Sequence, residues 1–185
     1  PGSNCDTDCA HAAKIVTGEE PEFVWHKETS LKKFDLVILP GGFSYGDYLR
    51  CGAIAKFSPV MQEVRRHAEA GRLVLGICNG FQILTRLGLL PGGSLIENAN
   101  RRFMCQWVRL KVLHRDNPYL AAVPDEIELP IAHREGRFVA RPGMAEQYLK
   151  AGLAPLVYRD NVNGSASAIA GLQDSTGRVF GLMPH

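Results

Sequence analysis

The chain of 185 residues has the length of one ordinary domain and is long enough to bury a hydrophobic core. Its apolar fraction of 45% and charged fraction of 22% are typical of globular proteins and exclude a disordered or fibrous chain. A net charge of +2 gives no reason to expect nucleic acid or a membrane surface as a partner, and no apolar run reaches the roughly 20 residues of a membrane-spanning helix.

The cysteines and the first residues indicate the compartment. The chain begins without the basic start or apolar middle of a signal peptide. Its 5 cysteines are therefore expected to be reduced thiols in a cytoplasmic protein. Cys5 and Cys9 are close in the sequence, but no second pair of zinc-binding residues lies near them. No metal site is therefore expected there. Cys51 and Cys105 have apolar neighbours and are interpreted as packing residues.

The first half of the chain predicts a parallel sheet. Residues 34–39 and 73–77 are nearly continuous apolar runs, which is typical of buried parallel strands. A helix is predicted between them, with Ser58 at its N-cap, Pro59 at its first position and Gly71 at its end. Strand, helix and strand at this spacing form a βαβ unit. A short helix over residues 81–87 follows.

The second half predicts antiparallel strands. Residues 102–113 alternate, and Phe103 and Trp107 on one face are interpreted as core. The remaining expected elements are strands at 127–132, 137–140, 153–158, 165–172 and 178–182, and a helix at 144–150. The sequence thus indicates one α/β domain with an antiparallel elaboration. Both ends are abrupt, and we expect the natural protein to have a strand before Pro1 and a helix after His185.

The segment Gly76-Ile77-Cys78-Asn79-Gly80 carries the strongest chemical signal. A cysteine that follows a buried strand and opens a helix, with a glycine two residues away on each side, has the pattern of a nucleophile elbow. The N-terminus of the helix lowers the pKa of such a thiol and stabilises a tetrahedral oxyanion. The alternative is a buried structural cysteine, which does not require flanking glycines.

A cysteine nucleophile needs a base, which is usually distant in the sequence. His185 follows the last predicted strand, and carboxyl ends of parallel strands gather at one edge of a sheet. His133 also follows an apolar segment and remains the alternative. His67, flanked by Arg65 and Arg66 on a helix, is interpreted as lying on a solvated face.

The loop after residues 34–39 contains three glycines, at positions 41, 42 and 46. Its backbone can approach a ligand closely, and one of its N–H groups is suited to hold an oxyanion together with the N–H of Asn79. The alternative is a simple tight turn. The position at the carboxyl end of a strand favours the oxyanion role.

Three motifs together resemble those of class I glutamine amidotransferases. They are Pro40-Gly41-Gly42, residues 76–82 and Met183-Pro184-His185, in the order of that family's oxyanion loop, nucleophile and histidine. The run 41–53 and the segments 1–6, 131–136 and 163–165 resemble, more narrowly, the family of glutaminase subunits of phosphoribosylformylglycinamidine synthases. These matches are spread over essentially the whole chain.

The resemblance implies a flavodoxin-like fold, an open and mostly parallel sheet with helices on both faces. Residues 1–185 would be a single type 1 glutamine amidotransferase domain, truncated at both ends. It implies hydrolysis of L-glutamine to glutamate and ammonia. A large synthetase subunit, with a small accessory subunit, would use the ammonia and ATP with Mg²⁺ to convert formylglycinamide ribonucleotide to its amidine. No cofactor and no metal are implied for this chain.

The resemblance also implies roles for individual residues. Cys78 is the expected nucleophile and His185 the general base. Gly42 and Asn79 are the expected oxyanion donors, and Gln82 is expected to help hold the glutamine. The family's orienting glutamate lies two positions beyond its histidine, outside this sequence. The chain also departs from the family pattern at Arg134, where glycine is usual, and at Val162, where proline is usual.

Two other functions remain as alternatives. A cysteine hydrolase of the peptidase or stress-protein type shares the elbow but usually lacks the 41–53 motif and the late histidine. An interaction subunit with a vestigial elbow would lack catalysis altogether. The arginines at positions 101, 102, 134, 137 and 141 either face the synthetase or form a solvated surface, and the role of Glu135 stays open.

Overall fold

The structure is a computed structural model and describes residues 5–32, 34–42 and 55–185. The helices are α1 (Asp6–Thr17), α3 (Val60–Glu69), α4 (Asn79–Leu87) and α5 (Met144–Lys150), with a 3-10 turn η2 (Ala166–Ala168). The strands are β1 (Leu36–Leu39), β2 (Leu73–Ile77), β3 (Ser94–Ile96), β4 (Met104–Val112), β5 (Glu126–His133), β6 (Arg137–Val139), β7 (Leu156–Tyr158), β8 (Ile169–Gln173) and β9 (Val179–Leu182).

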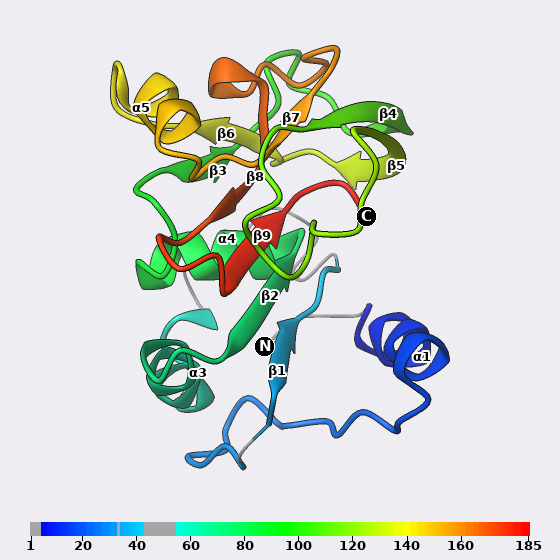
Figure 1. Cartoon of the computed structure of the whole chain (residues 1–185), viewed down its shortest axis with the longest axis vertical. Helices are drawn as coiled ribbons and strands as arrows, with labels where there is room; N and C mark the ends of the chain where they lie inside the picture. Colours follow the sequence, from blue (N-terminus) through cyan, green and yellow to red (C-terminus); the bar gives the residue numbers. More distant parts are fainter. Residues whose placement is uncertain (1–4, 33, 43–54) are drawn as a thin grey trace.

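The described strands form one mixed sheet and one small sheet. The larger has the order β1-β2-β9-β8-β7-β4-β5, and β3 pairs with β6 separately (Figure 1). Strands β1, β2 and β9 are parallel, whereas every pairing from β9 to β5 is antiparallel. The predicted α/β class and the antiparallel second half are both confirmed. The parallel strands end together, which brings the chain after β1, β2 and β9 to one edge.

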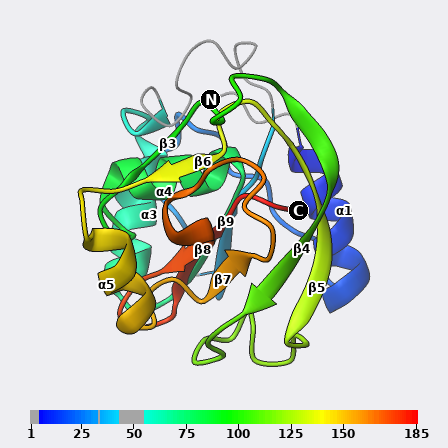
Figure 2. The ribbon, with the colours of Figure 1, turned by 90° about the horizontal axis from the view of Figure 1, so that it is seen from above.

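Helices cover both faces of the sheet. Figure 2 shows α3 and α4 on one side of β1, β2 and β9, and α1 on the other. The predicted βαβ unit is present, with α3 beginning at Val60, directly after Pro59, and Gly71 following it at a φ of 73°. Helix α4 ends as expected at Gly88, whose left-handed conformation suits glycine.

Two hydrophobic clusters hold the fold together. One lies between the sheet and α3 and α4, and includes the fully buried Phe81 and Leu84. The other lies under the antiparallel strands and includes Leu110, Ile131 and Leu156. Because burial of large apolar side chains contributes about 1.5–3 kcal/mol each, these clusters fix which face of each strand points inward.

Two interpretations of β4 were wrong. Phe103 and Trp107 are not in the core, because 50% and 67% of their surfaces are exposed. Cys105, on the same face, is also exposed and does not pack inside. Alternation showed which residues share a face, but the opposite face, with Val108 and Leu110, is the one that joins the core.

The interpretation of His67 as solvated was also wrong. It is buried, with 6% of its surface exposed, and its Nε2 lies 3.2 Å from the Leu73 carbonyl oxygen. The last turn of α3 faces the start of β2, so the imidazole fills that gap while neighbouring Arg66 points to solvent. Strand β3 was not predicted. Cys51, the motif residues 43–53 and residues 1–4 lie outside the described part of the chain.

Candidate active site

Cys78 stands at the turn between β2 and α4 in an unusual conformation. Its φ is 53° and its ψ −105°, a region that non-glycine residues seldom adopt. Two hydrogen bonds hold it there: its N–H donates to the Leu182 carbonyl at 2.8 Å, and its carbonyl accepts from the Gln82 N–H at 3.2 Å. The strand on one side and the helix on the other thus fix the thiol at the carboxyl edge of the parallel strands.

The glycines around Cys78 are required by close backbone approach. A Cβ on Gly80 would overlap the carbonyl group of Leu39 at the end of β1. A Cβ on Gly76 would lie 2.5 Å from Leu84 Cδ1. The start of α4 therefore packs directly against two strands, which only glycines permit at these positions. This is the physical basis of the pattern seen in the sequence.

The side chains of Cys78 and His185 both lie next to Gly41. A Cβ built on Gly41 would lie 3.1 Å from Cys78 Cβ and 3.4 Å from His185 Nε2. His185 is held by its N–H, which donates to the Pro130 carbonyl of β5 at 3.0 Å. Both side chains thus lie beside the same glycine, although they are distant in sequence.

The imidazole of His185 favours its neutral form. Partial burial lowers the pKa of His185 below its usual value of 6.5. A neutral imidazole at neutral pH can accept a proton from a thiol, which is the role of a general base. His185 therefore lies beside Gly41 in the protonation state that a general base needs.

His133 lies behind His185. Only 3% of His133 is exposed, and neither ring nitrogen has a hydrogen-bond partner in the described part of the protein. Burial, and secondarily the nearby His185, lowers the pKa of His133 to about 4. A Cβ on Gly136 would overlap the His133 ring, so glycine is needed there too.

Asn79 and Gly42, the two expected oxyanion donors, are joined by a hydrogen bond. The Asn79 side-chain amide donates a hydrogen bond to the Gly42 carbonyl, and this bond ties the first turn of α4 to the loop after β1. Gly42 has a φ of 135°, which favours glycine. Both expected oxyanion donors are therefore part of one connected structure beside Cys78.

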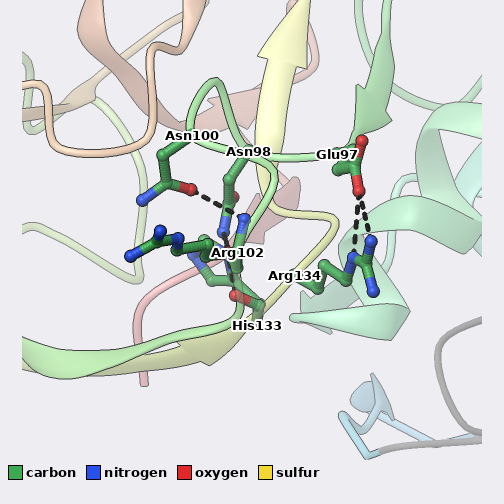
Figure 3. Close-up of polar contacts among 6 residues, drawn as sticks. All are labelled: Glu97, Asn98, Asn100, Arg102, His133 and Arg134. Atoms are coloured by element: carbon green, nitrogen blue, oxygen red, sulfur yellow. Dashed lines mark hydrogen bonds and ion pairs between the residues drawn. The ribbon is translucent and has the colours of Figure 1, made fainter.

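Gln82 joins α4 to the segment after β5. Its Nε2 donates to the Glu135 carbonyl at 2.9 Å. Figure 3 shows how the same segment is held from its other side. The Asn98 amide donates to the carbonyl oxygens of His133 and Arg102, each at 2.9 Å, and Arg134 pairs with Glu97 at 2.7 Å. The segment 133–136 is thus fixed next to the site by contacts on two sides.

Tyr158 and Asn163 were not singled out as site residues in the sequence. Tyr158, at the end of β7, is 2% exposed, and burial raises its pKa well above the usual value. The Asn163 hydrogen bond opposes this effect, and the nearby charge of Cys78 adds to it. Tyr158 therefore stays a neutral phenol. No spacing signal marked it, because it simply ends a predicted strand.

Residues 5–32, 34–42 and 55–185 contain neither a candidate metal site nor a candidate membrane-spanning helix. No group of three or more histidine, cysteine, aspartate or glutamate side chains comes together there in a way that could hold a metal ion. No helix in these ranges has the length and apolar character needed to cross a membrane.

Comparisons with known proteins agree on one family. The model of the CobB/CobQ-like glutamine amidotransferase domain matches residues 1–185. The chain is 50% identical to the phosphoribosylformylglycinamidine synthase subunit PurQ of Synechococcus sp., covering 100% of this chain and 83% of that protein. It is 51% identical to the PurQ subunit of Trichormus variabilis, with 100% and 84% covered. The solved structure of PurLQS from Thermotoga maritima matches with a TM-score of 0.87 and 45% identity, covering 100% and 83%.

Proposed function

The chain belongs to the CobB/CobQ-like glutamine amidotransferases and, among them, to the PurQ subunits of phosphoribosylformylglycinamidine synthase, and on this premise we propose that Cys78 and His185 carry its chemistry. It is an enzyme, the glutaminase subunit of this synthase in purine biosynthesis. The observation that best supports the residue roles is the position of Cys78 and His185 beside the same glycine, Gly41.

The reaction begins with attack on the side-chain amide of glutamine. Neutral His185 takes the proton of the Cys78 thiol, and the sulfur forms a bond to the amide carbon. The electron pair of the C=O bond moves to oxygen. The N–H groups of Gly42 and Asn79 donate to this oxyanion, and the first turn of α4 adds a favourable dipole.

The intermediate then breaks down in two steps. Protonated His185 gives its proton to the amide nitrogen, the C–N bond breaks and ammonia leaves, which yields a γ-glutamyl thioester on Cys78. Water then attacks the thioester carbon while His185 takes its proton. The C–S bond breaks, glutamate leaves, and His185 returns the proton to the thiolate.

The partners follow from the same proposal. L-glutamine is the substrate, and Gln82 helps to hold it by fixing the Glu135 segment. The ammonia passes to a large synthetase subunit, which works with a small accessory subunit and binds ATP and Mg²⁺. The chain itself uses no cofactor and acts in the cytoplasm. PurLQS, the solved complex with PurL and PurS, supports this assembly.

Replacement of Cys78 in the assembled synthase tests the proposal. We expect Cys78→Ala to lower glutamine-dependent synthesis by roughly 10³-fold or more, because no other group replaces the thioester route. Synthesis from added ammonium salt should be unchanged, since the synthetase is intact. The matched control is Cys105→Ala, which removes an exposed thiol.

Two outcomes would overturn the proposal. Glutamine-dependent synthesis that survives in Cys78→Ala would remove the thiol from the mechanism. An equal loss of the ammonium-dependent and glutamine-dependent reactions would point to a subunit that only stabilises its partner. The second outcome would favour the alternative of an interaction subunit with a vestigial elbow.

A further inference from the structure

The side chain of Asn98 is buried in the loop between β3 and β4, and the proposed chemistry gives it no role. Only 1% of its surface is exposed. Its Nδ2 donates hydrogen bonds to the carbonyl oxygens of Arg102 and His133, each at 2.9 Å (Figure 3). Its backbone N–H donates to the carbonyl oxygen of Arg134 at 2.8 Å. Asn98 therefore holds two successive carbonyl groups of the segment 133–136.

Every carbonyl group of that segment accepts a hydrogen bond from another part of the chain. Asn98 bonds the first two, Gln82 of α4 the third and Asn163 the fourth, at distances of 2.8–3.0 Å. Gln82 belongs to the helix that begins directly after Cys78. The segment is thus attached to the catalytic turn through Gln82 and to the β3–β4 loop through Asn98.

The Glu97–Arg134 ion pair joins the same loop to the same segment. Arg134 Nε and Nη2 both donate to Glu97 Oε1, at 2.9 and 2.7 Å. The two side chains are 44% and 38% exposed, and an ion pair so open to water contributes little. The bond from Asn98 to the His133 carbonyl is buried, so breaking it leaves an unpaired carbonyl group where water has little access. Asn98 is therefore the main contact between the loop and the segment.

Unpaired buried atoms gather at this contact. In residues 5–32, 34–42 and 55–185, the buried side-chain nitrogen and oxygen atoms without a hydrogen-bond partner are Asn98 Oδ1 and the two ring nitrogens of His133. Such atoms lower stability, and native proteins keep few of them. Local features that cost stability are expected at functional sites, so these two residues indicate a role beyond holding the fold.

We propose that Asn98 is a positioning residue for glutamine: its amide sets the position of the segment 133–136 against the substrate. This inference rests on the proposed function, in which Gln82 and that segment help to hold glutamine. The backbone hydrogen bonds of Cys78 and His185 are made with other residues. Loss of the Asn98 amide therefore weakens the binding of glutamine and leaves the attack of the thiol unchanged.

Replacement of Asn98 in the assembled synthase tests this role by steady-state glutamine hydrolysis. We expect Asn98→Ala to raise KM for glutamine roughly tenfold and to change kcat less than about twofold, because binding rather than chemistry is weakened. Asn98→Ser supplies a graded variant, since a hydroxyl donates one hydrogen bond where the amide donates two. Its KM should lie between those of the unchanged chain and Asn98→Ala, and it carries the test if the alanine variant does not fold.

Asn117→Ala is the matched control. Asn117 is 4% exposed, and its side chain also bonds the main chain, because its Oδ1 accepts from two backbone N–H groups at 3.0 and 2.8 Å. It lies next to Gly177, before the start of β9, whereas His185 follows the end of that strand. Asn117→Ala should lower the unfolding temperature as Asn98→Ala does, but KM for glutamine should stay unchanged.

A further variant separates Asn98 from the ion pair. Because the exposed pair contributes little, Arg134→Gly should raise KM by less than about threefold. A larger effect than that of Asn98→Ala would place the main contact in the ion pair and overturn the assignment to Asn98.

The remaining results are distinct. An unchanged KM in Asn98→Ala and Asn98→Ser would overturn the proposal and leave the glutaminase function intact. An equal rise in KM in Asn117→Ala would also overturn it, because the effect would then follow from lost stability. A fall in kcat alone would contradict a role in binding glutamine. Absence of glutamine hydrolysis by the unchanged synthase would refute the proposed function itself.

Discussion

Replacing Gly41 with alanine tests the geometry of the site without removing any reacting group. The new Cβ would lie 3.1 Å from Cys78 Cβ, closer than side chains normally pack, and 3.4 Å from His185 Nε2, at the limit of ordinary contact. The Cys78 side chain must then move by a few tenths of an ångström, and its position relative to His185 changes with it. Because a misplacement of about 1 Å costs about 100-fold, we expect kcat/KM for glutamine to fall about tenfold, or about 1.4 kcal/mol in activation free energy.

The assay is steady-state glutamine hydrolysis by the assembled synthase, combined with thermal unfolding. The matched control is Gly92→Ala, because a Cβ there would meet only Tyr148 Oη, at an ordinary 3.5 Å. Both variants should unfold at nearly the same temperature as the unchanged chain. A Gly41→Ala enzyme with unaltered kcat/KM would refute the placement of both catalytic side chains beside Gly41.

Two further predictions concern His133. Its pKa is lowered to about 4, chiefly by burial, so its contribution to stability is full above pH 6.5 and is lost as the pH falls towards 4. That loss should reach about 3 kcal/mol in urea unfolding, and a His133→Gln variant that shows the same pH dependence would contradict this account. Gly136→Ala should cost about 1–3 kcal/mol because its Cβ overlaps the imidazole. The cost should shrink when His133→Ala is added, and strictly additive effects would argue against the contact.

The backbone arrangement around Cys78 was largely predictable, because the glycines and the strand that shape it have local causes. Gly80 is dictated by the close approach of α4 to β1 and Gly76 by the close approach of α4 to β2, and a strand leading into Cys78 is visible as an apolar run. The nearness of His185 followed from a general property of parallel strands, whose carboxyl ends meet at one edge. The roles of Cys78, His185, Gly42, Asn79 and Gln82 in catalysis stay predictions, as does the division of the chain into a single domain.

Other features depend on packing between distant segments. Alternation in β4 could not say whether the face with Trp107 or the face with Leu110 is covered, because that is decided by the elements folded beneath it. His67 sits between charged neighbours, yet its position over β2 buries it. Strand β3 has only three residues and exists because β6 pairs with it. Tyr158 ends an ordinary predicted strand, and its burial is decided by the elements packed around that strand.

The most direct test of the central claim is labelling with an electrophilic glutamine analogue, followed by mass mapping of the modified peptides. The account predicts that Cys78 reacts about 100-fold faster than Cys5, Cys9 and Cys105, because Cys78 lies beside the same glycine as His185 and next to the proposed oxyanion donors. Excess glutamine should protect it. Equal labelling of all the cysteines, or labelling of Cys78 that glutamine does not slow, would contradict the claim that this elbow is a glutaminase site.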